Sequence, residues 1–253
     1  TSFSYDYTFD YLGRVTSISS NGNTLSRYLY NSKGFISRKW NGDFLSDFYS
    51  YDSKGNISSY THLGSNAVQM TYDEKNRILT YNQNNVKNLS FSYNPSETYQ
   101  LKTITDSISG NVINLSYIGN RLSSYIVSNG NQTVSNIQFI YNSKGERIYK
   151  IVNNSPIKYR YQNGCLVESI SSNSVVRYLY DSSNNAIGFI YNSNKYFYIR
   201  DALKCINKII DETGNTVVTY NYSPFGKILS IQDSSGINLG NINQILYKGY
   251  VYD

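Results

Sequence analysis

The sequence predicts an all-β protein, built as an array of antiparallel β-hairpins. The first observation is a turn segment with a strand on either side, which returns every 21 residues at Phe9, Tyr30, Tyr51, Tyr72 and Tyr93. A fixed period of this length is typical of a repeated supersecondary unit. The second observation is composition, because 28 Tyr and 10 Phe favour strands, 33 Asn and 17 Gly favour turns, and only three Ala are available to helices. At 253 residues the chain can bury a core.

One repeat predicts two strands and two turns. Residues 25–30 alternate as a strand does, and Asn-Ser-Lys-Gly at 31–34 predicts a type I turn whose last residue is left-handed. Residues 35–40 predict the returning strand, and Asn-Gly at 41–42 predicts a second tight turn. Tyrosines two residues apart share a face of such a strand, so each repeat offers aromatic side chains to its neighbours.

The residue that opens each repeated turn predicts a capping role. Asp and Asn alternate there, which indicates that the side-chain oxygen caps the turn and that its charge serves neither catalysis nor calcium binding. The positions are Asp52, Asp73, Asp181 and Asp211, alternating with Asn31, Asn94, Asn142 and Asn221.

The spacing changes along the chain. After Tyr93 the next starts, Tyr117 and Tyr141, are each 24 residues further on, and from Tyr196 the units follow more closely. We therefore divide the chain into repeats at 1–195 and a distinctive region at 196–253, continuous with the same sheet. Because the chain starts at Thr1 and stops within the pattern, we expect it to be a segment of a longer protein.

Charge and cysteine content exclude several classes of function. The formal net charge of +6 comes from 23 basic and 17 acidic residues spread over the repeats, so no nucleic-acid partner is expected. No apolar run is long enough to span a membrane. Cys165 and Cys205 have neither a disulfide nor a zinc-site spacing, and both are expected to be small buried apolar residues.

The sequence gives no support for catalysis. His62 is the only histidine and follows a strand end at Tyr60-Thr61, which favours an ordinary surface or loop position. The glycines are expected singly at turns, which excludes a glycine-rich phosphate loop. We expect no catalytic, cofactor-binding or metal-binding residue, no cofactor and no enzymatic activity.

The motifs resemble those of the RHS or YD-repeat family. They are Tyr-Asp-Ser-Lys-Gly-Asn-Ile at 51–57, Tyr-Asp-Glu-Lys-Asn-Arg-Ile at 72–78, Tyr-Asn-Tyr-Ser-Pro-Phe-Gly at 220–226 and Tyr-Lys-Gly-Tyr-Val-Tyr-Asp at 247–253. Region 196–253 is similar to the start of the RHS-associated core. Two departures are Lys204-Cys205, where the family usually has Gly-Asn, and Ser223-Pro224, where it commonly has Asp before Phe-Gly.

The resemblance implies a spiralling, curved sheet that forms part of a hollow β-shell. Bacterial members enclose a C-terminal toxin, and the animal teneurins use a similar shell in cell-surface adhesion. It implies a non-enzymatic shell segment of a secreted or cell-surface bacterial toxin protein, whose partners are its own toxin cargo or adjoining repeats. The alternative is an adhesin or carbohydrate-binding module that presents Tyr and Asn to a cell-surface glycan or receptor.

Overall fold

The structure is a computed structural model that describes residues 4–96, 99–201, 204–223 and 225–252. These residues form 22 strands and two short helical segments, and every register that joins two of the strands is antiparallel. The predicted all-β array of antiparallel hairpins is therefore confirmed. The chain forms two compact units, Ser2–Ile137 and Gln138–Asp253, which we call the N-terminal and C-terminal units. The predicted boundary at residue 196 rests on sequence motifs and stays a prediction.

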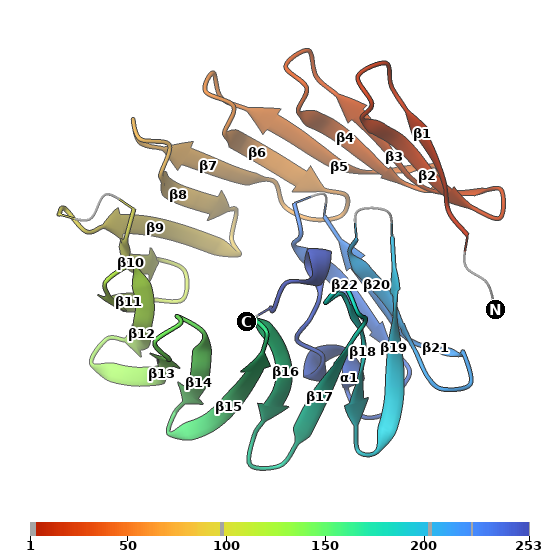
Figure 1. The fold of residues 1–253 in the computed structure, drawn as a ribbon. Coiled ribbons are helices and arrows are strands. Elements are labelled where there is room, and N and C mark those ends of the chain that lie inside the picture. The colour runs from red at the N-terminus through yellow and green to blue at the C-terminus, as the bar shows by residue number, and fades with distance from the viewer. Residues whose placement is uncertain (1–3, 97–98, 202–203, 224, 253) are drawn as a thin grey trace. The chain divides into compact units, whose positions relative to one another are not determined.

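The N-terminal unit is a meander in which each strand pairs with the next one in sequence, as Figure 1 shows for β1 to β9. Its strands are β1 (Asp6–Phe9), β2 (Val15–Ser20), β3 (Asn23–Tyr30), β4 (Ile36–Asn41), β5 (Phe44–Tyr51), β6 (Ile57–His62), β7 (Val68–Tyr72), β8 (Ile78–Gln83), β9 (Lys87–Tyr93), β10 (Leu101–Asp106), β11 (Asn111–Ile118) and β12 (Arg121–Asn129). Strand β13 (Gln132–Tyr141) spans the division between the units.

The C-terminal unit is also a meander, and its last strand is followed by residues 239–252, which we call the covering segment. Its strands are β14 (Arg147–Val152), β15 (Ser155–Gln162), β16 (Cys165–Ile170), β17 (Val175–Tyr180), β18 (Ala186–Tyr191), β19 (Asn194–Arg200), β20 (Ile206–Ile210), β21 (Thr216–Tyr222) and β22 (Ile228–Asp233). Helix α1 (Leu239–Ile242) then contacts β21 and β22, and the 3-10 turn η1 (Tyr247–Gly249) contacts β20.

The hydrophobic core of the C-terminal unit lies between one face of its sheet and this covering segment. Phe189, Ile206 and Ile209 on the strands and Leu239 on α1 are fully buried. Phe189 stacks on Tyr196 with ring centroids 5.3 Å apart, so the aromatic side chains of neighbouring strands supply much of the packing.

The register explains why the repeats begin at tyrosine. In the N-terminal unit the register shifts beside Tyr30, again beside Tyr51 and again beside Tyr72, each time with one extra residue on the strand that follows the repeated turn. Such a β-bulge adds one residue to one strand and bends it locally. The repeated sequence motif therefore corresponds to a tight turn followed by a bulge opposite the tyrosine.

Candidate functional site

The most regular constellation in the molecule is the turn that opens each repeat. Asp52 Oδ1 accepts the backbone N–H groups of Lys54 and Asn56 at 2.9 and 2.8 Å. The same two bonds form in the other turns, so the predicted capping role is confirmed where they occur. Because an Asn oxygen serves as well as an Asp oxygen, the bonds do not require charge. The other turns with both bonds open at Asp10, Asn31, Asp73, Asn142, Asp181 and Asp211.

One turn position differs from the prediction, and another opens a longer turn. Asn221 lies inside β21, and Ser223 takes the capping position, with its Oγ accepting the Lys227 N–H at 3.2 Å. The prediction for Asn221 is wrong because the repeat starts at Tyr222, where the bulge lies. Asn94 opens a longer turn, in which its backbone N–H donates to the Gln100 carbonyl at 2.8 Å.

At Lys204 the described residues make the same hydrogen bonds as the other turns of this chain, although glycine is absent there. Lys204 adopts a left-handed conformation with φ of 63°. Its N–H donates to the Asp201 carbonyl at 2.9 Å, and Asp201 Oδ1 accepts the Cys205 N–H at 2.9 Å. The departure from Gly-Asn therefore leaves the turn intact, at a strain of about 1 kcal/mol for a residue with a Cβ. Pro224, the second departure, lies outside the described residues.

Six of the repeats are joined to the chain before them by a tyrosine hydroxyl. Tyr51 Oη donates to the Ile36 carbonyl at 2.7 Å, and Tyr72 Oη donates to the Ile57 carbonyl at 2.9 Å. In every case the acceptor lies just after the preceding turn. We call this hydrogen bond between a tyrosine hydroxyl and an earlier carbonyl the tyrosine clamp. Its other members are Tyr30 to Val15, Tyr93 to Ile78, Tyr180 to Leu166 and Tyr222 to Ile206.

An arginine strengthens the clamp in two repeats. Arg14 Nε donates to Asp10 Oδ2 at 2.6 Å, and its guanidinium carbon lies 4.4 Å from the centroid of the Tyr30 ring. Arg77 makes the same pair of contacts with Asp73 and Tyr93. In the repeat where Phe35 replaces arginine, the Phe35 ring stacks on Tyr51 at 4.9 Å. The arginine of the motif thus links its own turn to the next tyrosine.

Removing one clamp hydroxyl should weaken the repeat measurably. We expect Tyr51→Phe to lower the free energy of unfolding by about 1 kcal/mol, because a partly buried carbonyl loses its hydrogen bond while the ring packing stays. Urea denaturation followed by circular dichroism measures this. Tyr11→Phe is the matched control, since Tyr11 is 91% exposed and should change nothing. Equal midpoints for the two variants would contradict a role for the clamp.

The clamp tyrosines also predict a loss of stability in alkali. Burial raises the pKa of Tyr51 and of Tyr180 to about 12, above the ordinary value of 10.0. A raised folded-state pKa means that stability is complete below pH 10 and is lost as the pH rises toward 12. We expect the free energy of unfolding to fall across this window, less steeply in Tyr51→Phe/Tyr180→Phe. A flat profile to pH 12 would oppose this reading.

His62 belongs to a polar cluster that the sequence does not reveal. It is the last residue of β6, and its Nδ1 lies 2.8 Å from Oδ1 of Asp47, whose side chain is 1% exposed. Ser46 Oγ lies 2.7 Å from Asp47 Oδ2. Across the strand pair is Lys39, whose pKa is lowered by burial and partly restored by the Asp47 charge.

The order of contacts in this cluster does not suit nucleophilic catalysis. In a serine-type triad the histidine lies between serine and carboxylate and takes the serine proton. Here the Asp47 carboxylate lies between Ser46 and His62.

The predicted surface position of His62 agrees with a side chain that is 32% exposed, but its attachment to a buried carboxylate was missed. A strand-interior Asp beside an alternating pattern is the only signal that could have indicated it.

Both cysteines are free thiols. Burial raises the pKa of the Cys205 thiol to about 11, so it stays protonated at neutral pH and is a poor nucleophile. Its predicted place as a small buried residue is confirmed by an exposure of 2%, whereas Cys165 is only partly buried. Among the described residues, no group of three or more His, Cys, Asp or Glu side chains could hold a metal ion.

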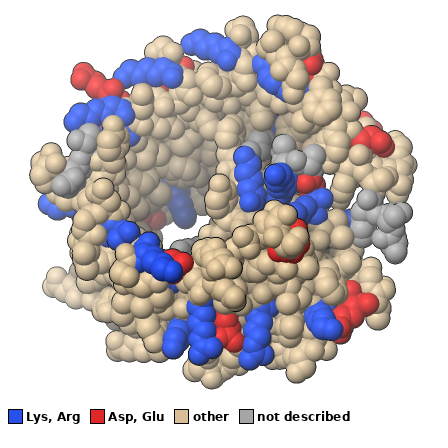
Figure 2. Space-filling model, in the orientation of Figure 1, with Lys and Arg blue, Asp and Glu red and all other residues tan. Residues whose placement is uncertain are grey.

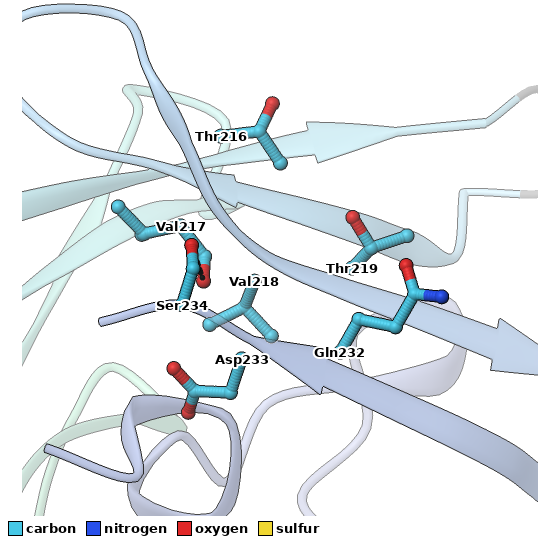
Figure 3. A pocket seen from close by; sticks show the side chains of 7 residues that line it. All are labelled: Thr216, Val217, Val218, Thr219, Gln232, Asp233 and Ser234. Atoms are coloured by element: carbon cyan, nitrogen blue, oxygen red, sulfur yellow. Dashed lines mark hydrogen bonds between the residues drawn. The ribbon is translucent and has the colours of Figure 1, made fainter. Parts of the chain in front are cut away.

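A shallow pocket of about 340 Å³ lies beside β21 and β22 (Figure 3). Its one charged lining residue, Asp233, is already engaged, because Oδ2 accepts the Gly240 N–H at 2.7 Å and Oδ1 accepts the Ser235 N–H at 2.8 Å. The carboxylate therefore holds the start of the covering segment. The remaining lining residues are Thr216, Val217, Val218, Thr219, Gln232 and Ser234.

Charges on the surface lie in small groups. Figure 2 shows Lys and Arg side chains distributed over the visible face, several of them next to Asp or Glu. Within the ranges that the structure describes, no helix is long and apolar enough to cross a membrane.

Comparison with known proteins confirms the resemblance to YD-repeat proteins. The sequence model described as Teneurin YD-shell matches residues 1–88. The tRNA3(Ser)-specific nuclease WapA of Bacillus spizizenii is 32% identical over 117 residues, which are 45% of this chain and 5% of that protein. The tRNA nuclease WapA of Bacillus subtilis strain 168 is 33% identical over 117 residues, which are again 45% of this chain and 5% of that protein. The chain thus spans about 5% of the length of these relatives.

Two solved structures are similar to this chain over almost its whole length, at low sequence identity. The crystal structure of TcdB2-TccC3-Cdc42 is 11% identical, with a TM-score of 0.43, and the match covers 99% of this chain and 19% of that chain. A structure of the Photorhabdus luminescens Tc holotoxin pore is 12% identical, with a TM-score of 0.41, over 98% of this chain and 19% of that chain.

Proposed function

We propose that this chain is a non-enzymatic wall segment in the shell of a secreted or surface-exposed bacterial RHS toxin protein, and that the shell encloses a toxic C-terminal cargo. The observation that carries the proposal is the tyrosine clamp. In the repeats from Tyr30 to Tyr93 it ties each hairpin to the hairpin before it through a side chain, in addition to the backbone hydrogen bonds between strands. A wall that must hold a cargo gains from such a second set of bonds, because strands separate only when both sets break.

The matches to relatives support the same proposal. The family match covers the clamped repeats at residues 1–88, and the curated relatives are named as nucleases while sharing only 117 residues with this chain. We assign the clamped repeats to containment and the toxic activity to another part of the parent protein. In this proposal residues 1–195 are repeats, and 196–253 begin the RHS-associated core, which is continuous with the same sheet.

Containment can be tested on the parent protein by limited proteolysis. We expect the cargo to resist protease as long as the repeats are folded, and to be digested sooner in Tyr51→Phe/Tyr72→Phe. Tyr11→Phe, which changes an exposed tyrosine outside the clamp, should digest like the wild type. Cargo that is cleaved at once in the wild type would overturn containment.

The alternative of a tyrosine-lined sugar-binding surface fits the structure less well. Tyr178, Tyr198 and Tyr220 are buried in the core of the C-terminal unit and cannot stack on a sugar. The single tryptophan, Trp40, has the Arg27 guanidinium carbon 5.4 Å from its ring centroid, so part of its ring face is covered. A glycan array with wild type and Trp40→Ala would test this alternative directly.

A further inference from the structure

Three charged side chains form a row across β15, β16 and β17. Arg160, Glu168 and Arg177 are direct partners in the strand register. Arg160 Nη1 donates to Glu168 Oε2 at 3.0 Å, and Arg177 Nε donates to Glu168 Oε1 at 3.0 Å. The Glu168 side chain is only 10% exposed, whereas the two arginine side chains are 58% and 63% exposed. A nearly buried carboxylate therefore holds two exposed guanidinium groups in place.

This arrangement keeps the capacity to bind an anion. A guanidinium carries five N–H groups in a rigid fork, and Glu168 engages one nitrogen of each arginine. The rest of each fork remains directed to solvent, and the three side chains together carry one positive charge. Because Glu168 fixes the orientation of both forks, a carboxylate or sulfate that binds there loses less side-chain entropy than it would with two unrestrained arginines.

A further basic residue, Lys195, extends the row by two strands. Arg177 is in register with Ile190, and Ile190 is in register with Lys195. Neighbouring strands are about 4.8 Å apart, which places the Cα atoms of Arg160, Arg177 and Lys195 at intervals of roughly 10 Å. Lys195 is half exposed, and its Nζ lies 3.5 Å from Glu212 Oε1.

The row lies on the face of the sheet opposite the core. Side chains alternate between faces along a strand, and the residues next to the row, Tyr159, Val176 and Phe189, are buried in the core of the C-terminal unit. The basic row therefore does not compete with the aromatic packing of that unit.

We propose that the row formed by Arg160, Glu168, Arg177 and Lys195 binds a linear anionic polysaccharide laid across the strands. Wide, regular intervals between cations suit a polymer with one acidic group per sugar or per pair of sugars. Single-stranded nucleic acid is bound by a basic groove together with aromatic side chains on which its bases stack, whereas Ile190, in register between Arg177 and Lys195, is aliphatic. Duplex DNA presents one charge per about 1.7 Å of axis, which is far denser than the row.

The test is a titration of the 253-residue chain with hyaluronan and with polygalacturonate, and with oligodeoxythymidylate as the competing polymer. The key variant is Arg160→Gln/Glu168→Gln/Arg177→Gln, which removes the whole set and leaves no buried carboxylate alone. It lowers the net charge by one. Arg27→Gln, near the exposed Asp43 of the N-terminal unit, lowers the net charge by the same amount and is the matched control.

We expect wild type to bind at least one of the two polysaccharides, the triple variant to bind it about tenfold more weakly, and Arg27→Gln to bind it like the wild type. Circular dichroism and thermal melting establish that both variants are folded. Equal weakening in the two variants would assign binding to overall charge and overturn the site. Failure of the wild type to bind either polysaccharide, or tighter binding of the oligonucleotide, would also overturn the proposal.

Discussion

Replacing Asn243 by leucine is expected to detach the covering segment and to lower the free energy of unfolding by about 3 kcal/mol. Asn243 is 2% exposed, and its Oδ1 accepts the Tyr198 hydroxyl at 2.6 Å. Its Nδ2 donates to the Ile245 carbonyl at 2.8 Å and to the Tyr220 hydroxyl at 3.3 Å. Leucine has a similar volume but removes the partner of the Tyr198 hydroxyl and of the Ile245 carbonyl, while the Tyr220 hydroxyl keeps its bond to the Gly240 carbonyl at 2.8 Å.

The measurement is urea denaturation together with amide hydrogen exchange of residues 239–252. Asn241→Leu is the matched control, because Asn241 is exposed and its side chain bonds only to the Asn238 side chain at 2.6 Å. We expect a change of less than about 0.5 kcal/mol for the control, as for most surface substitutions. Fast exchange in the covering segment of Asn243→Leu alone would confirm that this residue anchors it. Similar losses for both variants would reject that role.

Gly188→Ala should be at least as damaging, since the added methyl group has no space. A Cβ at residue 188 would lie 2.1 Å from the Tyr196 carbonyl oxygen and 3.1 Å from the Phe197 Cα. These are backbone atoms of the paired strand β19, so the strand pair must separate locally. We expect a loss of about 3 kcal/mol or more, at the upper end of the range for overpacking.

Gly64→Ala provides the comparison for Gly188→Ala. Gly64 has φ of +80°, and nothing lies within 4 Å of an added Cβ, so only conformational strain of about 1 kcal/mol is expected. Thermal melting of the two variants separates steric exclusion from backbone strain. If Gly64→Ala proved the more harmful, the close approach of β18 and β19 would be wrong.

The turns were predictable because their chemistry is local. Asp52 caps a turn whose other members lie within four residues of it, so the motif contains all the parts of the structure that it forms. The tyrosine clamp was only half predictable. Alternation placed the tyrosines on a shared face, but the acceptor of Tyr51 is a carbonyl 15 residues earlier, and a backbone group leaves no trace in the sequence.

The remaining features depend on segments that are far apart in the chain. Asn243 is bound by Tyr198 and Tyr220, which precede it by 45 and 23 residues, and nothing in its own neighbourhood indicates those partners. The expectation that glycines occur singly at turns is wrong for Gly188, which lies inside β18 because Tyr196 and Phe197 approach closely. Likewise, the burial of Asp47 follows from its partners on neighbouring strands, Lys39 and His62.

The tyrosine clamp has a consequence for how such a chain can change its length in evolution. Duplication or loss of 21 residues leaves every hydroxyl opposite its carbonyl, because the unit is copied together with both partners. The clamp reaches back 15 residues in the regular repeats, 14 at Tyr180 and 16 at Tyr222, which sets the tolerance for indels between the partners at about one residue. Larger insertions are confined to the first turn of a unit, which lies between one clamp tyrosine and the next acceptor carbonyl and so outside the interval that the clamp measures, as in the longer turn between Asn94 and Gln100. The chain is thus able to grow by whole modules while its side-chain cross-links stay in phase.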